Sequence, residues 1–364
     1  MSALSSFLFT ANPARVLFGA GKLDCLASEV DRLGAKRVLV LCTPNQRKQA
    51  ESIAAQLSER CAGMFDQAAM HVPSHIVSQA LERAQQLSAD CVVAFGGGST
   101  IGLGKGMALH SNVPIIAIPT TYAGSEMTPI YGVTDNALKK TGNDLRVLPK
   151  TVIYDPHLTL GLPLAVSVTS AINAIAHAAE GMYAKDTNPI MCVLASDGIA
   201  ALAESLPKLT LDSADIVGRT QALYGAWLCG TVLGHLGMSL HHKLCHTLGG
   251  SFDLPHSETH TVVLPHVLAY NSSSAPDAMR RIAAALKCSD AAIGVFELAK
   301  NNGAPTSLRE LGMKESDLDR AADIAMATPY WNPRPLERSA IRALLQHAFE
   351  GVVPSAKDRG HPYP

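Results

Sequence analysis

Short apolar runs alternate with amphipathic stretches through the first part of the chain. The runs are rich in Val and Ile: "VLFG" from Val16, "RVLVL" from Arg37, "CVVAFGGGS" from Cys91 and "VPIIAIPTT" from Val113. Such runs are typical of parallel strands that are buried on both faces, and the segments between them have helical periodicity. The pattern predicts a βαβ arrangement around a parallel sheet.

The pattern changes after "VIYDPHLTLGLP", which ends at Pro163. Beyond it strand signals nearly vanish, and segments rich in Ala and Leu with helical periodicity continue to the C-terminus. We therefore expect an α/β domain over residues 1–158 followed by an all-helical domain over residues 159–364.

The composition of the chain indicates which kinds of molecule it binds. The 364 residues are 47% hydrophobic, and 30 Lys and Arg balance 31 Asp and Glu, so no basic excess indicates nucleic-acid binding. The apolar runs look too short to cross a bilayer. Eight scattered cysteines without a C-x-x-C pair, and an N-terminus without a signal-peptide pattern, favour reduced thiols. We expect a cytoplasmic protein that binds a small molecule, with neither nucleic acid nor membrane as partner.

Glycines after a predicted strand indicate a phosphate site. In "AFGGGSTIGLGKG" the glycines Gly96, Gly97 and Gly98 begin a predicted helix, where bare N–H groups could approach a pyrophosphate. Taken alone, such a loop could equally be a tight turn. Two more strand ends, "LCTPNQ" and "IPTTYAGSEMTP", carry small polar residues, and ligands of α/β sheets bind at these ends. The spacing is not G-x-G-x-x-G, so we expect a dinucleotide site of another kind.

Histidines gather in the second part of the chain. Asn173 and His177 in "SAINAIAHAAE" stand four residues apart and would share one face of a helix. The stretch "HHKLCHTLGGSFDLPHSETH" holds five more: His241, His242, His246, His256 and His260. A lone histidine on an apolar helix is more often a packed core residue, but this number beside turn signals favours a polar cleft. Cys245 is interpreted as a passive buried thiol.

The motifs "GGGS", "PTTYAGSEMT", "VIYDPHLT", "NAIAHAAE" and "HHKLCHTLGGSFDLPHSETHTVVLPHVLAYN" occur in one order along most of the chain. In this order they resemble those of the iron-containing (group III) alcohol dehydrogenases. More narrowly, "GGGSTIGLGKG", "LRVLPKTVIYDP" and "NPRP" resemble the maleylacetate reductase branch of that family. The resemblance implies a dehydroquinate synthase-like fold, with an α/β nicotinamide-dinucleotide domain before an all-α catalytic domain, and a homodimer.

The resemblance also implies a ligand set. Metal-binding members of the family use one Asp and three His, at the positions of Asn173, His177, His242 and His256, and a further His beside the nicotinamide matches His246. An Asn amide binds transition metals far less well than an Asp carboxylate, and the maleylacetate reductases share this Asn. The resemblance therefore implies an enzyme without a metal.

The coenzyme is expected to be NADH, NADPH or both. Thr43 stands where many relatives place an Asp against the ribose, so no carboxylate there would repel a 2′-phosphate. Gly102 is a further difference from the family pattern, because the dehydrogenases commonly have Asp at this position. The expected cofactor-binding residues are Thr43, Asn45, Gly96, Gly97, Gly98, Ser99, Thr120, Thr121, Ser125, Thr128 and Lys140.

The implied reaction is NAD(P)H-dependent reduction of the carbon–carbon double bond of maleylacetate, and of substituted maleylacetates, to 3-oxoadipate in aromatic-compound degradation. The expected catalytic residues are Asn173, His177, His242, His246 and His256, with His246 orienting the substrate or relaying a proton. Substrate carboxylates call for cations or strong donors, for which Arg146, Tyr330, Arg334 and Lys140 are candidates. For each of these four, a surface charge or a packed aromatic is an equally good interpretation.

Two alternatives stay open at this point. The chain could be a metal-dependent alcohol or polyol dehydrogenase in which the Asn173 amide oxygen serves as a ligand. It could instead be a non-catalytic nucleotide-binding or regulatory protein that has lost both metal and activity.

Overall fold

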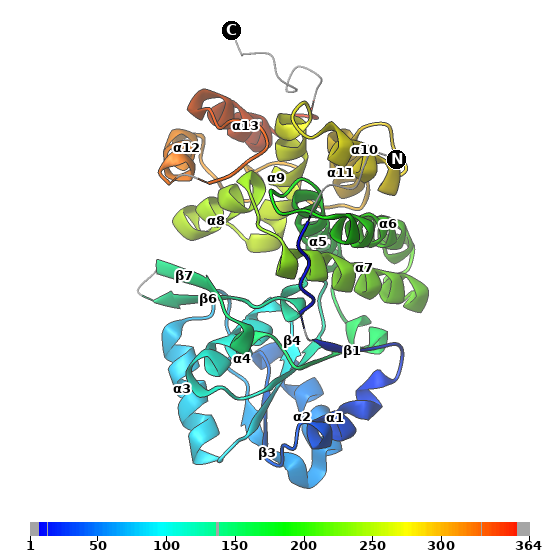
Figure 1. Ribbon diagram of the computed structural model, residues 1–364, viewed down its shortest axis with the longest axis vertical. Helices are drawn as coiled ribbons and strands as arrows, with labels where there is room; N and C mark the ends of the chain where they lie inside the picture. Colours follow the sequence, from blue (N-terminus) through cyan, green and yellow to red (C-terminus); the bar gives the residue numbers. More distant parts are fainter. Residues whose placement is uncertain (1–6, 13, 136–137, 329, 355–364) are drawn as a thin grey trace. The chain divides into compact units, whose positions relative to one another are not determined.

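The computed structural model describes residues 7–12, 14–135, 138–328 and 330–354, and these fall into two compact units (Figure 1). The sheet unit comprises Asn12–Leu162 and Ala214–Leu223. The helical unit comprises Pro163–Ser213 and the chain from Tyr224 onward, together with the residues before Asn12.

The division differs from the predicted boundary after residue 158. Residues 159–162 stay with the sheet unit, and so does the short segment Ala214–Leu223. Arg219 explains both, because it is completely buried and donates to the Leu162 carbonyl oxygen at 2.9 Å and to the Tyr122 hydroxyl at 3.1 Å. A side-chain contact across 57 residues leaves no signal in local periodicity.

The sheet has six parallel strands in the order β1-β8-β5-β4-β2-β3. Their bounds are β1 (Arg15–Phe18), β2 (Val38–Leu41), β3 (Cys61–Phe65), β4 (Cys91–Gly96), β5 (Ile115–Pro119) and β8 (Thr151–Tyr154). The predicted strands near Val16, Arg37, Cys91 and Val113 all belong to it. The strand β3 was not predicted, because "CAGMF" contains a glycine and lies half-buried at the sheet edge.

Helices cover both faces of the sheet, as Figure 1 shows. They are α1 (Leu26–Arg32), α2 (Arg47–Leu57), α3 (Ser74–Gln86) and α4 (Gly98–Ser111). In β2 the side chains of Val38 and Val40 pack with α1 and α2, whereas Leu39 and Leu41 pack with α3 and α4. A strand buried on both faces has no polar side, which is why "VLVL" is a continuous apolar run. A separate antiparallel hairpin, β6 (Ile130–Asp135) with β7 (Leu138–Asn143), completes the unit.

Helices alone form the regular structure of the helical unit in its described part, as predicted. They are α5 (Leu164–Met182), α6 (Pro189–Leu211), α7 (Ile216–His235), α8 (Leu240–Phe252), α9 (His256–Asn271), α10 (Pro276–Ala285), α11 (Ala291–Asn301), α12 (Leu318–Met326) and α13 (Arg338–Glu350). The first residues of α7 fall in the segment that clusters with the sheet unit. One hydrophobic cluster joins α8, α9, α12 and α13.

Two helices are buried almost along their whole length. Every residue of α5 from Ser167 to Met182 is buried, and so is every residue of α9 from Thr259 to Asn271. A helix that is apolar all round is stable only inside a protein, and the many alanines of α5 let α6 and α9 approach it closely. Polar side chains on these two helices are therefore held away from water.

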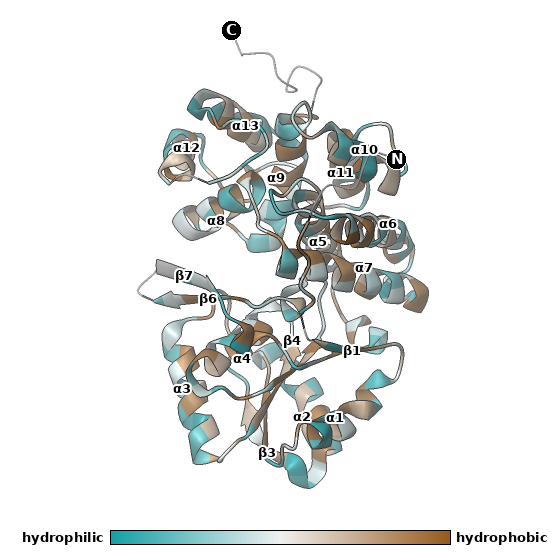
Figure 2. Ribbon diagram, in the orientation of Figure 1, coloured by the Kyte–Doolittle hydropathy of each residue, from teal (hydrophilic) through white to brown (hydrophobic). Residues whose placement is uncertain are grey.

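The expectation that no apolar run could cross a bilayer is wrong for α6 on length and composition. Its 23 residues have a mean hydropathy of 1.4 over the most apolar window. However, Ala195, Ile199, Leu202 and Leu206 form a buried face that packs on α5, and Figure 2 shows apolar residues along both helices. In this structure α6 thus packs one face against the core of the helical unit.

All eight cysteines are free, as predicted. Cys42 and Cys91 are buried in the sheet unit, and Cys229 and Cys245 are buried in the helical unit. Burial raises the pKa of the Cys42 thiol to about 11 and that of Cys91 to about 12.

Gly181 in α5 tests how closely the helices pack. A Cβ added there would lie 2.2 Å from Cγ1 of Val232 in α7, so Gly181→Ala should lower the unfolding free energy by about 1–3 kcal/mol through overpacking. The matched control is Gly250→Ala in α8, where nothing lies within 4 Å and helix propensity should raise stability by up to about 1 kcal/mol. Urea unfolding of both variants measures the difference, and equal stability would contradict the close packing.

Candidate functional site

The glycine loop lies where β4 ends and α4 begins. Gly96 has a φ of 152°, and an added Cβ would lie 2.5 Å from Thr100 Oγ1. A Cβ on Gly97 would lie 2.8 Å from Thr121 Cγ2, whereas at Gly98 the nearest atom is Ala123 Cβ at 4.0 Å. The chain itself therefore requires glycine at the first two positions. Gly98 borders open space at a helix start that no side chain caps, which suits an approaching phosphate.

A single glutamine connects the three strand-end loops. Gln46 Nε2 donates to Thr120 Oγ1 at 2.9 Å, and Thr43 Oγ1 donates to Gln46 Oε1 at 3.2 Å. The same Oε1 would lie 2.9 Å from a Cβ at Gly96. The structure thus brings Thr43, Thr120 and the glycine loop together, as predicted, whereas Gln46 was missed because a lone Gln in a polar loop has no pattern.

A buried lysine holds the third loop. Lys105 Nζ donates to the Ser125 carbonyl oxygen at 2.6 Å, to Thr128 Oγ1 at 2.9 Å and to the Ile130 carbonyl oxygen at 2.7 Å. Burial lowers the pKa of Lys105 to about 7, although the nearby Glu126 carboxyl opposes this. Two of the expected cofactor-binding residues, Ser125 and Thr128, are therefore positioned by a side chain that sequence reasoning did not select.

The other expected residues of the sheet unit differ in their surroundings. Asn45 is exposed beside Thr43, and Ser99 and Thr121 are half-buried at the glycine loop. Lys140 is exposed on β7, 3.6 Å from Asp135, and Arg146 is exposed and 2.6 Å from Asp144. Each of these two cations already has a carboxylate partner, which favours the surface-charge interpretation for both.

Three helices of the helical unit bring the histidines together. His177 on α5 has its ring centroid 5.1 Å from that of His242 on α8 and 6.2 Å from that of His260 on α9. His242 and His260 are 5.0 Å apart. The rings of His246 and His256 join this group from exposed positions, 6.1 Å from His242 and 4.5 Å from His260 respectively.

A carboxylate that sequence reasoning missed organises this group. Glu180 on α5 is completely buried and accepts hydrogen bonds from the backbone N–H groups of Ser239, His241 and His242 at 3.0, 2.8 and 3.3 Å. It also accepts from Ser239 Oγ at 2.6 Å and pairs with His242 Nδ1 at 2.7 Å. Glu180 therefore acts as the N-terminal cap of α8 from another helix.

The pairing with Glu180 fixes the orientation of the His242 ring. A carboxylate only accepts hydrogen bonds, so Nδ1 carries the hydrogen and Nε2 is the atom left for a ligand. Burial alone would raise the pKa of Glu180, but the hydrogen bond and charge of His242, with further help from Ser239, lower it well below its usual range. The group is thus an ionised carboxylate that supports an imidazole.

Four buried polar atoms of this group have no hydrogen-bond partner among the described residues. They are Asn173 Oδ1, His177 Nδ1, His242 Nε2 and His260 Nε2. Burial without a partner costs free energy, so such atoms normally mark the place of a bound ligand or ordered water. We therefore take Asn173, His177, His242 and His260 as the polar centre of the helical unit.

Burial sets the protonation of these rings. It lowers the pKa of His177 and of His260 well below the usual value, and neighbouring histidines add to the effect. Burial likewise lowers the pKa of His241 to about 3. These three imidazoles are neutral at neutral pH, and each offers one N–H and one lone pair.

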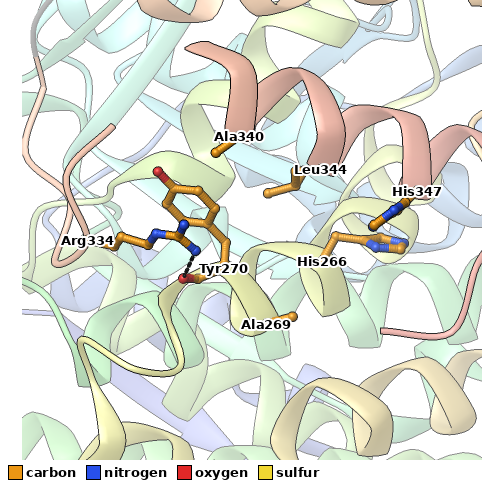
Figure 3. A pocket seen from close by; sticks show the side chains of 7 residues that line it. All are labelled: His266, Ala269, Tyr270, Arg334, Ala340, Leu344 and His347. Atoms are coloured by element: carbon orange, nitrogen blue, oxygen red, sulfur yellow. Dashed lines mark hydrogen bonds between the residues drawn. The ribbon is translucent and has the colours of Figure 1, made fainter. Parts of the chain in front are cut away.

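Tyr330 and Arg334 share a pocket of about 420 Å³ in the helical unit, with Thr328 and Trp331 in its lining. The Tyr330 ring lies 5.8 Å from Lys243 Nζ. Arg334 stacks on the Tyr270 ring at 4.1 Å and donates to the Tyr270 carbonyl oxygen at 3.1 Å, as Figure 3 shows. The cavity drawn there holds only about 10 Å³, room for no more than one water.

Both halves of the chain match one protein family. Residues 13–156 match the family described as iron-containing alcohol dehydrogenase, and residues 167–349 match the C-terminal domain of the Fe-containing alcohol dehydrogenase family. The chain belongs to the iron-containing alcohol dehydrogenase family. Its parallel sheet unit and its helical unit are those of the family fold, which confirms the predicted fold class.

Relatives within the family narrow the comparison. The chain is 58% identical over 352 residues to a maleylacetate reductase of Burkholderia cepacia, covering 97% of this chain and all of the relative. A solved maleylacetate reductase from Agrobacterium tumefaciens has 53% identity and a TM-score of 0.94, covering 96% of this chain and all of that one. A solved putative alcohol dehydrogenase from Ralstonia eutropha JMP134 has 61% identity and a TM-score of 0.95 with the same coverage.

The family name implies iron, and the residues at the family's ligand positions fit it poorly. Asn173 brings an amide in place of a carboxylate, and the nearby Glu180 carboxylate is already occupied by its own donors. Among the described residues, a group of potential ligating atoms within 4.8 Å of one another belongs to His241, Cys245 and His260, which are not the positions that the resemblance implies as ligands. A dication would thus find no charged oxygen at the four ligand positions that the resemblance implies, which are Asn173, His177, His242 and His256.

The glycine loop generates the first prediction for the site. Replacement of Gly97 would conflict with Thr121 inside the protein, so Gly98→Ala is the sharper test. The variant should fold normally and weaken NADH binding at least tenfold if a phosphate approaches within contact of Gly98. Fluorescence titration measures this, with Gly161→Ala as control because its nearest atom is 3.9 Å away. Unchanged affinity in Gly98→Ala would contradict the assignment.

The buried carboxylate of Glu180 generates the second prediction for the site. In Glu180→Gln one acceptor oxygen becomes an N–H donor that faces other donors, so the unfolding free energy should fall by about 2–3 kcal/mol. The exposed pair of Glu204 with Lys287, 2.7 Å apart, supplies the control, because Glu204→Gln should change stability by less than about 1 kcal/mol. Urea unfolding at pH 7 compares the two, and similar losses would argue against Glu180 as the cap of α8.

Proposed function

We infer that this chain is an NAD(P)H-dependent oxidoreductase that reduces the carbon–carbon double bond of maleylacetate to give 3-oxoadipate. One observation carries the substrate assignment: the helical unit holds three buried imidazoles, each with one ring nitrogen that has no partner among the described residues, beside an amide at the position where the resemblance implies a carboxylate ligand in metal-binding relatives. Relatives of 51–58% identity named maleylacetate reductase support it along nearly the whole chain.

Reduction of the carbon–carbon double bond requires hydrogen-bond donors more than a metal ion. Hydride from the nicotinamide adds to the alkene carbon β to the ketone, the double-bond electrons move to form an enolate, and a proton at the α carbon completes the reduction. An enolate is less basic than the alkoxide of an alcohol dehydrogenase reaction. Preorganised donors in a buried site can therefore hold its charge, each contributing about 3–4 kcal/mol in the transition state.

The residues of the polar centre have distinct parts in this proposal. His177 and His242 contact the enone oxygen or a substrate carboxylate, with His242 held by Glu180. His246 and His256 border the centre from exposed positions, which suits a residue that orients the substrate or exchanges a proton with solvent. The pocket of Tyr330 and Arg334 is a candidate for the second carboxylate, because the Tyr330 hydroxyl is buried without a partner among the described residues.

The enzyme is proposed to work without a metal. A dication would supply Lewis acidity to an alkoxide, but the amide of Asn173 gives it no negative ligand. The substrate carries two carboxylates of its own, and the charge of Glu180 is already balanced by its own hydrogen-bond donors at the start of α8. We further propose that Thr43 permits both NADH and NADPH, because its hydroxyl brings no charge to the end of β2.

The cellular setting remains a proposal as well. Eight free thiols agree with a soluble enzyme of the cytoplasm, and we expect a homodimer, as the family resemblance implies. The expected partner is a small dicarboxylate. Neither nucleic acid nor membrane belongs to the proposal.

The direct test is turnover of maleylacetate by freshly purified protein, followed by nicotinamide absorbance. NADH or NADPH should be oxidised in proportion to 3-oxoadipate formed, and prior treatment with EDTA should leave kcat within twofold of the untreated enzyme. Purified protein should contain well under one equivalent of Fe or Zn. Activity that follows a stoichiometric metal content would instead support the metal-dependent dehydrogenase.

A single substitution tests the role of Asn173. Asn173→Asp introduces one negative charge one helical turn from His177, so Zn²⁺ affinity should rise at least tenfold and maleylacetate turnover should fall at least tenfold. Metal content after dialysis against Zn²⁺ and kcat after chelation measure the two effects separately. Wild-type turnover in the Asn173→Asp variant would show that this position does not tune the site.

A further inference from the structure

His260 of the polar centre forms a buried pair with a second histidine, His241. His241 Nε2 on α8 lies 2.9 Å from His260 Nδ1 on α9, and both side chains are completely buried. Cys245, one turn after His241, has its sulfur 3.7 and 4.0 Å from the two ring nitrogens of His241. The proposed reaction has so far given this pair no part.

The pair can exist in two hydrogen arrangements. Because both rings are neutral, each carries one hydrogen, and one ring must donate while the other accepts. If His241 Nε2 donates, the hydrogen of His260 must be on Nε2. If His260 Nδ1 donates, His260 Nε2 is a bare lone pair. The choice decides what His260 presents to a ligand.

The neighbouring cysteine favours the first arrangement. Burial raises the pKa of the Cys245 thiol well above its usual value, so the sulfur carries a hydrogen. His241 Nδ1 is a lone pair only in the first arrangement, where it can accept from that thiol. In the second arrangement the lone pair of His241 Nε2, the nitrogen nearer to the sulfur at 3.7 Å, already accepts from His260. The Nδ1–H group then has only the sulfur, a weak acceptor, 4.0 Å away, so the first arrangement makes the better hydrogen bond.

His260 Nε2 belongs to the polar centre. It is buried without a partner among the described residues, and the centroid of its ring is 4.5 Å from that of His256 and 5.0 Å from that of His242. A hydrogen on this atom would make His260 a donor of fixed direction in a site whose reaction develops negative charge on oxygen.

We propose that His260 is a further substrate-contacting residue, whose Nε2–H donates a hydrogen bond to the substrate oxygen that becomes negative, and that His241 is the positioning residue that fixes this tautomer. The proposal rests on the reductase function inferred above. A neutral donor adds no charge and releases no proton, so the reaction stays balanced by the hydride and the solvent proton alone.

Two substitutions at His260 test the contact in the enzyme with coenzyme bound. His260→Leu removes the donor and should lower kcat for maleylacetate by about 10²–10³-fold. His260→Gln places an amide N–H near the position of Nε2 and should keep kcat within about tenfold of wild type. The NADH dissociation constant should stay within twofold in both, and circular dichroism should confirm folding.

Two substitutions at His241 test the positioning role. His241→Gln retains an N–H that can donate to His260 Nδ1 and should keep most of kcat. His241→Leu removes it and should lower kcat about tenfold without changing the coenzyme dissociation constant. A purely structural role would instead lower thermal stability and kcat together in both variants, with no recovery in His241→Gln.

A measurement on the unmodified protein completes the test. In enzyme labelled with ¹⁵N-histidine, the ring signal that disappears in His260→Gln should show the hydrogen on Nε2, and a hydrogen on Nδ1 would overturn the proposal. So would a folded His260→Leu enzyme with kcat within threefold of wild type. These outcomes differ from failure of the inferred function, in which unmodified enzyme would not reduce maleylacetate at all.

Discussion

The helical unit depends on how one buried carboxylate is satisfied. Glu180 has no access to solvent, and its two oxygens accept from backbone and side-chain groups at the start of α8. An ionised group in the core is tolerated only when it is fully hydrogen-bonded. The packing of α5 on α8 is therefore stable in the register that keeps the hydrogen bonds of Glu180. That register places His242 against His177 and leaves the buried Nε2 atom of His242 for a ligand. Helix packing and site geometry are therefore consequences of the same contact.

Local spacing allowed part of the site to be predicted. Asn173 with His177, and Gly96 to Gly98, are patterns within a few residues, and the apolar runs of the parallel sheet are equally local. Glu180, Gln46 and Lys105 were missed because their hydrogen-bond partners are distant in sequence. Glu180 contacts a residue 62 positions away, Gln46 one 74 positions away and Lys105 one 20 positions away. A single Glu, Gln or Lys inside a helix or loop has no periodicity that distinguishes a structural role from a surface one.

Side-chain neighbours also explain what the sequence alone misjudged or left open. Apolar length alone makes α6 look like a membrane helix, but its buried face and its contact with α5 are tertiary properties. For Lys140 and Arg146 the sequence left substrate binding and surface charge equally open, and the structure places Asp135 and Asp144 beside them. His260 was counted among the histidines of a polar cleft but not among the expected catalytic residues, because its closeness to the His242 and His256 rings is visible only in the fold. For α6 the missing information was its packing against a helix distant along the chain, whereas for Lys140 and Arg146 it was a carboxylate only a few residues away, which periodicity does not reveal as a partner.

The distribution of buried thiols has a practical consequence. Cys42 and Cys91 lie in the strand layer, whereas Cys229 and Cys245 lie among the helices. A thiol reagent reacts with such a group only when the surrounding structure opens, so the rate of modification reports the free energy of that opening. Because each unit contains its own buried cysteines, the chain carries built-in reporters that can time the local unfolding of its two halves separately, without any introduced label.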